Sequence, residues 1–494
     1  MKALLIDFNH DVSSIGIRYI SSYLKKNGHE VSILFLPIQM GESTRGSDRH
    51  EHVESDDEIK QIIHLIRDLN PGLIGLSMMT HFFHRAVKLT KAIKEEFKIP
   101  VIFGGVHPSI SPDECIEHAD LVCVGEGEET FLDLANKIEK NEPYDSLQSL
   151  WVKKDGRIIK NLVRPLTEDL DKYPFPDYEL KTQYILDEGS VKKMSMDLLK
   201  KYLADYLNTK GIYRIICSRG CPFSCTYCYN SIFWNLYPNK GKYNRRRSVN
   251  NVIAELEWIK KNFDFVKLIR IVDDSFIATT EEWIRDFSRQ YKEKINLPLS
   301  CLINPQTINK QKIDYLCDAG LAHVQMGIES TERVNKEVYK RNTSNEQIIN
   351  VTKILSDKKD LICEYDLIVD NLYETREDLI NKIKLVLEIS KPYILGLYSL
   401  ILYPHSPLYE KAKKDGKLDA KHTRYSKNMS SINNNYFNSL LLLSPYLPKK
   451  IAYFFLKNDD VARRVMVRSI RHAYELSLKS PLPIKNFLKW MVSW

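Results

Sequence analysis

The chain has 494 residues, of which 43% are hydrophobic and 28% are charged, and its formal net charge is +8 at pH 7. This length predicts two or three domains, and the apolar fraction is ordinary for a globular protein with a buried core. Six of the nine cysteines are scattered without pairing intervals, which argues against the disulfide framework of a secreted protein.

The sequence opens on a strand-like apolar run at residues 3–6 with no charged leader before it. No stretch of about 18 or more apolar residues is present to span a membrane, so we expect a cytoplasmic protein. The positive charge is concentrated in residues 441–494, which hold ten Lys or Arg and three Asp or Glu. Because the basic surplus is confined to this tail and no RNA-binding module is recognisable, the sequence argues against a nucleic-acid partner.

Short apolar strands alternate with helices over the first 140 residues. Strands are expected at residues 2–8, 31–36, 73–78, 101–103 and 121–124, and helices at residues 14–27, 57–69, 82–97 and 130–140. This alternation predicts an α/β fold with a doubly wound, Rossmann-like parallel sheet in a first domain of residues 1–141. In such sheets, ligands bind on the loops at the carboxyl ends of the strands.

Four of these loops carry glycines and polar residues. They read Asp11-Val12-Ser13-Ser14-Ile15-Gly16, Ser77-Met78-Met79-Thr80, Gly104-Gly105-Val106-His107-Pro108 and Gly125-Glu126-Gly127-Glu128. The order and spacing of this set resemble those of cobalamin-binding domains, in which glycines let the backbone approach a bulky nucleotide tail. A domain that binds another nucleotide, or no ligand, is the alternative.

This resemblance implies cobalamin contacts at Asp11, Ser13, Gly16, Ser77, Gly104, Gly105, His107, Gly125, Glu126, Gly127 and Glu128. Ser13 stands where that family has its cobalt-ligating histidine, and a hydroxyl is a poor ligand for cobalt. We therefore expect cobalamin in its His-off form, with no histidine below the metal. His81 and His84 follow the third strand and are the alternative cobalt ligands.

Residues 142–211 lose the alternation and are expected to form a linker. A hairpin is predicted at residues 151–159 around Asp155-Gly156. A proline-rich crossing segment follows at residues 173–178, and a helix is expected at residues 192–207, as a lid over the substrate or as a spacer.

The stretch from Cys221 to Cys228 places three cysteines on one short loop, with Cys225 between them at spacing C-x3-C-x2-C. Three thiolates on one loop suit three irons of a [4Fe–4S] cluster and leave the fourth iron open. Zinc prefers a fourth protein ligand, which is not evident nearby, although a structural metal knuckle remains the alternative. Cys217 lies among strand-like residues and is expected to be buried instead of ligating.

With the preceding strand at residues 212–217 and the turn Arg219-Gly220, this stretch resembles the radical S-adenosylmethionine (SAM) enzymes. In that family the open iron chelates the amino and carboxylate groups of SAM. The resemblance implies a partial (β/α)6 barrel over residues 212–418, and apolar runs predict its strands at residues 213–217, 266–272, 299–303, 323–328, 362–369 and 395–402. Barrel sites lie at the carboxyl ends of the strands.

The residues at those ends imply the SAM contacts. By resemblance these are Tyr227, Asp273, Asp274, Glu329, Ser330 and Arg341. The acidic pair could instead bind a metal or cap a helix, Ser330 could be a helix cap, and Arg341 could be a solvated helix-end residue. The loop at residues 370–375 departs from the family, because its Glu-Thr pair is present and the usual glycines are not.

Residues 419–494 are expected to form a helical extension in which basic and apolar residues interleave, as at Arg463, Arg464, Arg468 and Arg471, before the chain ends on Trp494. This pattern suits either a peripheral contact with a membrane surface or a helical cap over the barrel mouth.

The family resemblance implies an enzyme, most simply a C-methyltransferase that uses a [4Fe–4S] cluster, SAM and methylcobalamin on an unactivated carbon of a small-molecule or lipid-like substrate. An external one-electron donor of the flavodoxin or ferredoxin type is implied as well. The alternatives are a cyclisation or oxidative rearrangement with the same cofactors, and a cobalamin or cluster sensor without turnover. The cofactors carry such chemistry, and the protein positions them.

Overall fold

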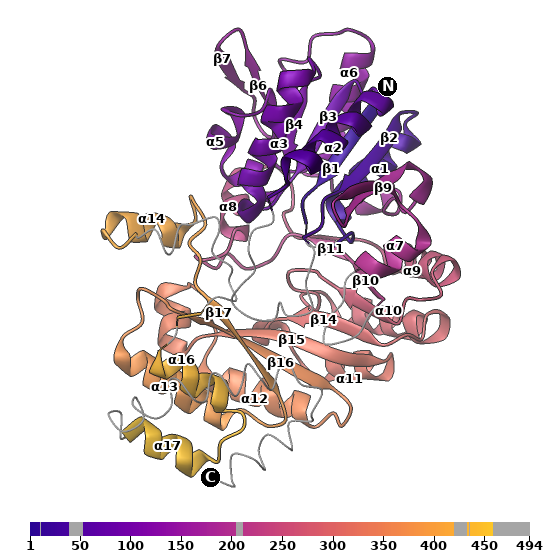
Figure 1. The fold of residues 1–494 in the computed structure, drawn as a ribbon. Helices are drawn as coiled ribbons and strands as arrows, with labels where there is room; N and C mark the ends of the chain where they lie inside the picture. The colour runs from indigo at the N-terminus through magenta and orange to yellow at the C-terminus, as the bar shows by residue number, and fades with distance from the viewer. Residues whose placement is uncertain (10, 39–52, 204–210, 419–431, 434, 458–494) are drawn as a thin grey trace.

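The structure is a computed structural model, and it describes residues 1–494 except 10, 39–52, 204–210, 419–431, 434 and 458–494. The described part is built on two large sheets, one of nine strands and one of six, and a small two-stranded ladder. Figure 1 shows the nine-stranded sheet above the six-stranded one, each with helices packed against it.

The five predicted strands of the first domain form the parallel centre of the nine-stranded sheet, in the order β5-β4-β3-β1-β2. They are β1 Lys2–Asp7, β2 Glu30–Phe35, β3 Leu73–Ser77, β4 Val101–Gly104 and β5 Leu121–Cys123. The main helices are α1 Ile15–Lys26, α2 Asp56–Leu69, α3 Phe83–Glu96 and α6 Glu128–Glu139. Alternate residues of β1 enter the apolar cores on opposite faces of the sheet, which confirms the doubly wound architecture.

The region expected as a linker contributes two hairpins to the edges of this sheet. The predicted hairpin is present as β6 Leu150–Lys154 and β7 Arg157–Lys160, which pair antiparallel beside β5. At the other edge, β8 Gln183–Asp187 runs parallel to β2 and pairs with β9 Ser190–Lys193. The predicted helix is therefore wrong in its first residues: Lys192 and Lys193 are strand, and the helix is the short α7 Met196–Tyr202.

The proline-rich crossing segment is held by a buried arginine of α1. The Arg18 side chain is fully buried, and its guanidinium lies 3.9 Å from the ring centroid of Tyr178. Arg18 Nη1 donates to the carbonyl of Asp177, and Nη2 donates to the carbonyl of Val12 at 2.7 Å. The buried charge is thus satisfied by backbone acceptors, which fixes the crossing segment against the first domain.

The second sheet is the expected partial barrel. Its six strands are parallel and follow the chain order, β10 Ile212–Ile215, β13 Leu268–Ile271, β14 Leu299–Ile303, β15 Leu321–Glu329, β16 Ile362–Val369 and β17 Ile394–Ser399. The intervening helices include α9 Val249–Asn262, α10 Glu281–Lys294, α11 Lys310–Asp318, α12 Asn345–Ser356 and α13 Arg376–Glu388, and α14 Pro407–Lys414 follows the last strand.

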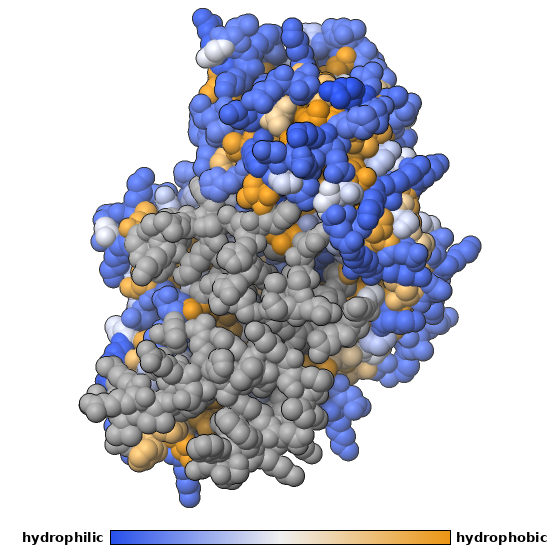
Figure 2. All heavy atoms as spheres, viewed as in Figure 1, coloured by the Kyte–Doolittle hydropathy of each residue, from blue (hydrophilic) through white to orange (hydrophobic). Residues whose placement is uncertain are grey.

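The described part of the C-terminal extension is helical. Helix α16 Tyr436–Leu443 packs on α13 and β17, and α17 Lys449–Lys457 follows it. The arginines expected on a membrane-facing or capping surface lie outside the described residues. Within the part that is described, no helix is long and apolar enough to cross a membrane. On the face drawn in Figure 2, hydrophilic side chains dominate the described surface, with apolar ones in small groups between them.

A glycine in the sheet core gives a stability prediction. A Cβ at Gly75 of β3 would lie 2.8 Å from Phe131 Cε2 and 3.0 Å from Leu5 Cδ2. Gly75→Ala should therefore lower the free energy of unfolding by about 1–3 kcal/mol through overpacking. Gly16→Ala is the control, because a Cβ there meets nothing within 4 Å and alanine favours a helix. Urea denaturation followed by circular dichroism measures both, and equal midpoints for the two variants would contradict the packing argument.

Candidate functional site

The loop that carries the three cysteines is anchored to the far side of the barrel. Cys225 is buried, and Cys221 and Cys228 are half-buried. The Thr226 N–H donates to the carbonyl of Tyr339 at 3.0 Å, and the Thr226 carbonyl accepts from the N–H of Leu408 at 3.0 Å. The loop is thus held between the turn after β15 and the start of α14, which limits its freedom to move.

The three thiols lie in one electrostatic neighbourhood. Desolvation, with smaller contributions from the charges of Asp274 and of the other cysteines, raises the pKa of Cys221 and of Cys228 to about 12. A positively charged metal group would reverse this balance and favour thiolates. The donor set of three sulfurs on one loop therefore fits an iron–sulfur group by its chemistry. No set of three His, Cys, Asp or Glu side chains in the described residues is already gathered as a metal site, so the ligand assignment stays a prediction.

The predicted acidic pair divides between two roles. Asp273 is buried, and its carboxylate accepts from the N–H of Cys217 at 2.6 Å and from Ser218 Oγ at 2.5 Å. Asp273 therefore closes the barrel wall, and Cys217 is fully buried as expected. Asp274 accepts from the hydroxyl of Tyr229 at 3.3 Å. Its side chain is exposed but lies in a recess where the surrounding protein raises its pKa, and it faces the cysteine loop.

Three of the predicted SAM residues converge at the end of β15. Arg341 Nη1 lies 3.0 Å from Glu329 Oε1 and 3.4 Å from the hydroxyl of Tyr227. The pairing of β15 with β16 shifts its register between Gly327 and Glu329, and Glu329 has a φ of 64°, so the strand bends where its carboxylate emerges. A Cβ at Gly327 would lie 2.2 Å from Glu329 Oε1, so the Glu329 carboxylate packs directly over this glycine, two residues before it.

Ser330 lies beside this group, but its side chain is committed elsewhere. Ser330 Oγ donates to Glu374 Oε1 at 2.6 Å, and Glu374 pairs with the buried ammonium of Lys382 at 2.5 Å. Glu374 belongs to the Glu-Thr pair that this loop keeps from the family pattern, although the usual glycines of the loop are missing. Thr375, its neighbour, caps α13 in a capping box with Asp378. The Glu-Thr pair of this chain is therefore structural, a role that could be seen only from the [ST]-x-x-[DE] spacing before a helix.

The first of the predicted cobalamin loops crosses to the barrel. Asp11 Oδ1 accepts from the N–H of Ser13 at 2.7 Å, and Asp11 Oδ2 pairs with Arg214 of β10 at 2.8 Å. Ser13 Oγ is buried and has no hydrogen-bond partner in the described part of the chain. A Cβ at Gly16 would meet nothing within 4 Å. An unpartnered buried hydroxyl close to an open glycine fits a ligand bound at this loop.

The second and third loops pack closely on each other. Gly105 has a φ of 101°, and a Cβ there would lie 2.8 Å from the carbonyl oxygen of Met78 and 3.3 Å from Ser77 Oγ. Only glycine fits this approach. The side chain of His107 is fully buried against the ring of Phe83, with ring centroids 4.6 Å apart. The imidazole of His107 is therefore part of the domain core, and a ligand on the loop would meet its backbone first.

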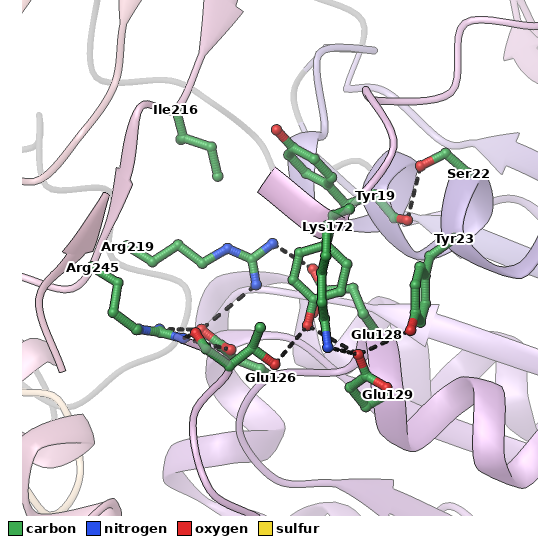
Figure 3. A network of polar contacts seen from close by, with 12 residues as sticks. Tyr19, Ser22, Tyr23, Glu126, Glu128, Glu129, Lys172, Ile216, Arg219 and Arg245 are labelled. Carbon is green, nitrogen blue, oxygen red and sulfur yellow. Dashed lines mark hydrogen bonds and ion pairs between the residues drawn. The ribbon is translucent and has the colours of Figure 1, made fainter. Parts of the chain in front are cut away.

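The fourth loop docks onto the barrel. Gly125 has a φ of 95°, a Cβ there would lie 2.0 Å from the hydroxyl oxygen of Tyr237, and that oxygen accepts from the N–H of Glu126 at 3.0 Å. Glu128 Oε1 accepts from Arg219 at 2.5 Å, and Glu126 pairs with Arg245 and Arg219. Figure 3 shows these carboxylates pointing at the two arginines.

The fourth loop contacts the barrel closely, and its cobalamin contacts stay predictions. The sequence predicts cobalamin contacts for its four residues, but the described carboxylates of Glu126 and Glu128 are held by arginines of the barrel. The Cα of Gly125 faces Tyr237, and a Cβ at Gly127 would lie 3.0 Å from Ile20 Cδ1 of α1. Sequence reasoning missed Arg219, Tyr237 and Arg245, because nothing local to them indicates an acidic loop about a hundred residues earlier as their partner.

Comparison with known proteins identifies two domains in the chain. The family model of the B12 binding domain matches residues 1–135, and that of the radical SAM superfamily matches residues 215–386. The chain belongs to the cobalamin-dependent radical SAM enzymes. This confirms the predicted architecture and the predicted set of cofactors, namely cobalamin, SAM and a [4Fe–4S] cluster. The individual contact residues and the His-off state of cobalamin stay predictions.

Several relatives of this radical SAM enzyme extend over most of its length. An uncharacterized methyltransferase of Pyrococcus horikoshii is 26% identical over 404 residues, covering 81% of this chain and 78% of the relative. A cytidylyl-2-hydroxyethylphosphonate methyltransferase of Streptomyces wedmorensis is 25% identical, with coverages of 71% and 70%. An anaerobic magnesium-protoporphyrin IX monomethyl ester cyclase of Rubrivivax gelatinosus is 23% identical, with coverages of 74% and 60%.

Two solved structures share the fold of most of this radical SAM enzyme. The methyltransferase TsrM from Kitasatospora setae aligns with a TM-score of 0.65 at 16% identity, over 84% of this chain and 76% of TsrM. The cobalamin-dependent radical enzyme OxsB aligns with a TM-score of 0.60 at 20% identity, over 85% of this chain and 56% of OxsB. The order of the two domains is therefore the same in all three proteins.

The buried His107 gives a prediction for stability against pH. Burial lowers the pKa of His107 to about 4, below the value of about 6.5 in the unfolded chain. The unfolded state then binds more protons between these values, so His107 should remove up to about 3 kcal/mol of stability as the pH falls from 6.5 toward 4.

Unfolding by urea at pH 7, 5.5 and 4.5 measures this loss, and His107→Gln should show less of it than the wild type. His64→Gln serves as the control, because the His64 side chain is 71% exposed. An identical pH slope in the wild type and His107→Gln would contradict a neutral, buried imidazole.

Proposed function

We propose that this enzyme transfers a methyl group to an unactivated carbon of a small-molecule substrate. The observation that carries the proposal is the direct joining of the two cofactor-binding edges: loops at the carboxyl ends of β1 and β5 contact the barrel at Arg214, Arg219 and Arg245. Methyltransferases among the relatives support this reaction. Such an arrangement presents two cofactors to one substrate.

We propose which residues would hold each cofactor. We assign the [4Fe–4S] cluster to Cys221, Cys225 and Cys228. SAM would lie against Tyr227, Asp274, Glu329 and Arg341, and cobalamin against the loops that carry Asp11, Ser13, Gly16, Ser77, Gly104 and Gly105. When bound, the cluster and SAM supply a hydrogen-abstracting radical, and cobalamin supplies the methyl group.

The chain itself supplies orientation and charge at this site. Arg341 is buried and donates to both Glu329 and the carbonyl of Gly327, the latter at 2.6 Å. Because the guanidinium is already fixed by these bonds, its position does not have to be ordered when a ligand arrives. Asp273 holds the strand end before the cysteine loop, and Asp274 leaves a carboxylate facing that loop.

The inner face of the barrel supports a polar substrate. Along β15, Gln325, Gly327 and Glu329 are partly exposed, and the residues between them are buried. Gln325 Nε2 donates to Asp366 Oδ2 at 2.7 Å, and Arg270 donates to Gln325 Oε1 at 2.5 Å. A packed barrel is filled by branched apolar side chains instead, so this lining favours a ligand with polar groups over a purely hydrocarbon one.

Asp366 supports a polar group on the substrate. Asp366 Oδ1 is buried and has no hydrogen-bond partner among the described residues. Gly396 pairs with Asp366 on the neighbouring strand, and a Cβ there would lie 2.5 Å from this oxygen, so the glycine gives the Asp366 side chain its space. A buried oxygen without a partner costs stability until one is present. We therefore propose a substrate with a polar group that hydrogen-bonds Asp366, as a donor to the carboxylate or as an acceptor from the protonated acid.

Asp366 also gives a prediction. Burial raises the pKa of Asp366 well above its usual value, so the folded state holds its proton more tightly than the unfolded state does. Stability should then fall as the pH rises from about 4 through the raised pKa. Asp366→Asn removes this titration and should raise the free energy of unfolding at pH 7 by about 1–3 kcal/mol.

Urea unfolding between pH 4.5 and pH 8 measures this difference. Asp360→Asn is the control, because Asp360 is exposed. A variant at position 366 that is no more stable than the wild type at pH 7 would show that the carboxyl group is satisfied and would remove the argument for a polar group on the substrate.

The cysteine loop also supports reduction by an external one-electron donor. Trp234 is 42% exposed, and its indole N–H donates to the carbonyl of Cys221 at 3.1 Å. The loop is thus reachable from outside through an aromatic side chain bonded to its first cysteine. We include a flavodoxin- or ferredoxin-type donor and a cytoplasmic location in the proposal. A lipid-like substrate with membrane contact through residues 458–494 rests on the sequence alone.

A cyclisation with the same cofactors is the second candidate, and the cyclase among the relatives favours it. The mass of the product separates the two reactions. Methyl transfer gives a product about 14 Da heavier than the substrate and moves label from the methyl group of SAM into it, whereas cyclisation does neither.

The first experiment is the iron and cobalt content of the protein, purified without oxygen from cells supplied with cobalamin and then reconstituted. About four iron atoms and one cobalt atom per chain are expected. Iron without cobalt would remove the methylcobalamin reaction, and cobalt without iron would overturn the cluster assignment.

The cluster assignment gives a sharp prediction. Cys225→Ala should reduce the reductive formation of 5′-deoxyadenosine from SAM to background, because one thiolate ligand is lost, and it should leave cobalamin bound. Cys317→Ala is the control, since Cys317 lies on α11 away from the loop, and it should cleave SAM like the wild type. Liquid chromatography of deoxyadenosine and the absorbance of bound cobalamin provide the measurements. Retained cleavage in Cys225→Ala would refute the assignment.

A further inference from the structure

A small antiparallel ladder stands directly before the cysteine loop. Its strands are β11 Ser218–Arg219 and β12 Arg245–Arg246, and they pair in a register that sets Arg219 opposite Arg245. Like charges directly opposed across two strands destabilise a ladder. The Arg245 side chain is only 3% exposed and that of Arg219 only 16%, so water does little to screen the two charges. The ladder therefore needs acceptors from elsewhere in the chain.

The carboxylate acceptors come from the B12-binding domain, and the carbonyl of Thr167 accepts from Arg245 Nη1 at 2.6 Å. Glu126 lies between the two arginines, 3.1 Å from Arg245 Nη1 and 3.5 Å from Arg219 Nη1. Glu128 Oε1 accepts from Arg219 Nη2 at 2.5 Å. The guanidinium of Arg219 also lies over the rings of Tyr19 and Tyr173, 5.5 Å and 5.2 Å from their centroids. Figure 3 shows Arg219 reaching out of the barrel into this group.

The other register pair of the ladder is satisfied within the barrel. Ser218 donates to Asp273, and Arg246 lies 3.6 Å from the same carboxylate and donates to the carbonyl of Phe276 at 2.7 Å. The ladder is thus divided between the domains. One pair is held by the strand end of β13, and the pair nearer the cysteine loop is held by the B12-binding domain.

Little freedom separates Arg219 from the first cysteine. Gly220 is the only residue between Arg219 and Cys221, and its φ is +81°. A Cβ at Gly220 would lie 2.4 Å from the carbonyl oxygen of Tyr243, so the backbone is already in close contact there. A shift of Arg219 therefore displaces Cys221 directly, because the glycine has no open space in which to absorb it.

We propose that Arg219 is a positioning residue through which the B12-binding domain sets the geometry of the cysteine loop. The ion pairs of Glu126 and Glu128 with the two arginines stabilise the ladder. The ladder fixes the position of Cys221, and the loop can then bind and cleave SAM. Chemistry at the cluster therefore depends on a B12-binding domain that is docked on the barrel. This dependence includes SAM cleavage, although that step needs no cobalamin. The inference rests on the proposed function, because it takes the loop as the cluster site.

The test uses the full-length, reconstituted enzyme with cobalamin bound. Glu128→Gln and Glu126→Gln, alone and combined, remove the negative charges and keep the shape of the side chains. Glu129→Gln is the matched control: Glu129 is the next residue of the same helix, but its carboxylate bonds Lys172 at 2.5 Å and Tyr23 at 3.0 Å and does not touch the ladder.

Two readouts separate a positioning role from general damage. The first is the change that SAM causes in the electron paramagnetic resonance spectrum of the reduced cluster, and the second is the rate of deoxyadenosine formation without substrate. The combined Gln variant should keep its cobalamin, lose the SAM-induced spectral change and form deoxyadenosine at least about tenfold more slowly, as expected for charge-assisted hydrogen bonds. Glu129→Gln should stay within about twofold of the wild type.

Arg219→Lys keeps the inference testable if the combined variant does not fold. Lysine retains the charge but cannot bond two carboxylates with a planar fork, so cluster content should be kept and the SAM-induced change weakened. The inference is overturned if Glu128→Gln and Arg219→Lys both match the wild type. It is also overturned if the Gln variants lose cobalamin but cleave SAM normally, because the carboxylates would then serve cobalamin. A wild type that forms no deoxyadenosine would instead refute the proposed function itself.

Discussion

Two carboxylates of the first sheet cross to two arginines of the second, and the arrangement of both cofactor edges depends on this contact. Glu126 sits on the loop between β5 and α6 and Glu128 is the first residue of α6, whereas Arg219 and Arg245 flank the segment that contains the three cysteines. A parallel sheet binds ligands at its carboxyl edge, and a radical SAM barrel does the same. Because these two edges face each other, polar loops of both domains meet at the interface. The ion pairs join the two domains there.

Buried ion pairs of this kind contribute specificity more than net stability. Removing charges from water costs about as much as their attraction returns, but removing one partner leaves the other charge buried and uncompensated. The interface therefore tolerates one relative position of the domains and penalises others. The contacts of Asp11 with Arg214 and of Gly125 with Tyr237 also favour this relative position of the domains, because each contact forms only in that position.

The six barrel strands and the five central strands of the first sheet could be predicted because each is an apolar run bounded by polar turns. The edge strands β8 and β9 could not, since their residues alternate weakly and their pairing is decided by β2, about 150 residues earlier. At the acidic pair, neighbouring residues point to opposite sides, but sequence does not say which of Asp273 and Asp274 faces the loop. The contacts of the acidic loop with the barrel could not be predicted for a related reason: the glycines of the loop indicate a close approach, and only the structure shows that the approaching group is Tyr237.

The order of the ladder's parts along the chain has a consequence for synthesis. The acidic loop at residues 125–128 and the strands up to residue 193 leave the ribosome before the arginines at positions 219 and 245. Domains fold as units, the N-terminal one first, so the acceptors are in place when the basic ladder emerges. The first domain thus acts as a template on which the nascent second domain closes its basic ladder. In a circularly permuted chain that reversed this order, the two arginines would have to assemble before their counter-ions exist.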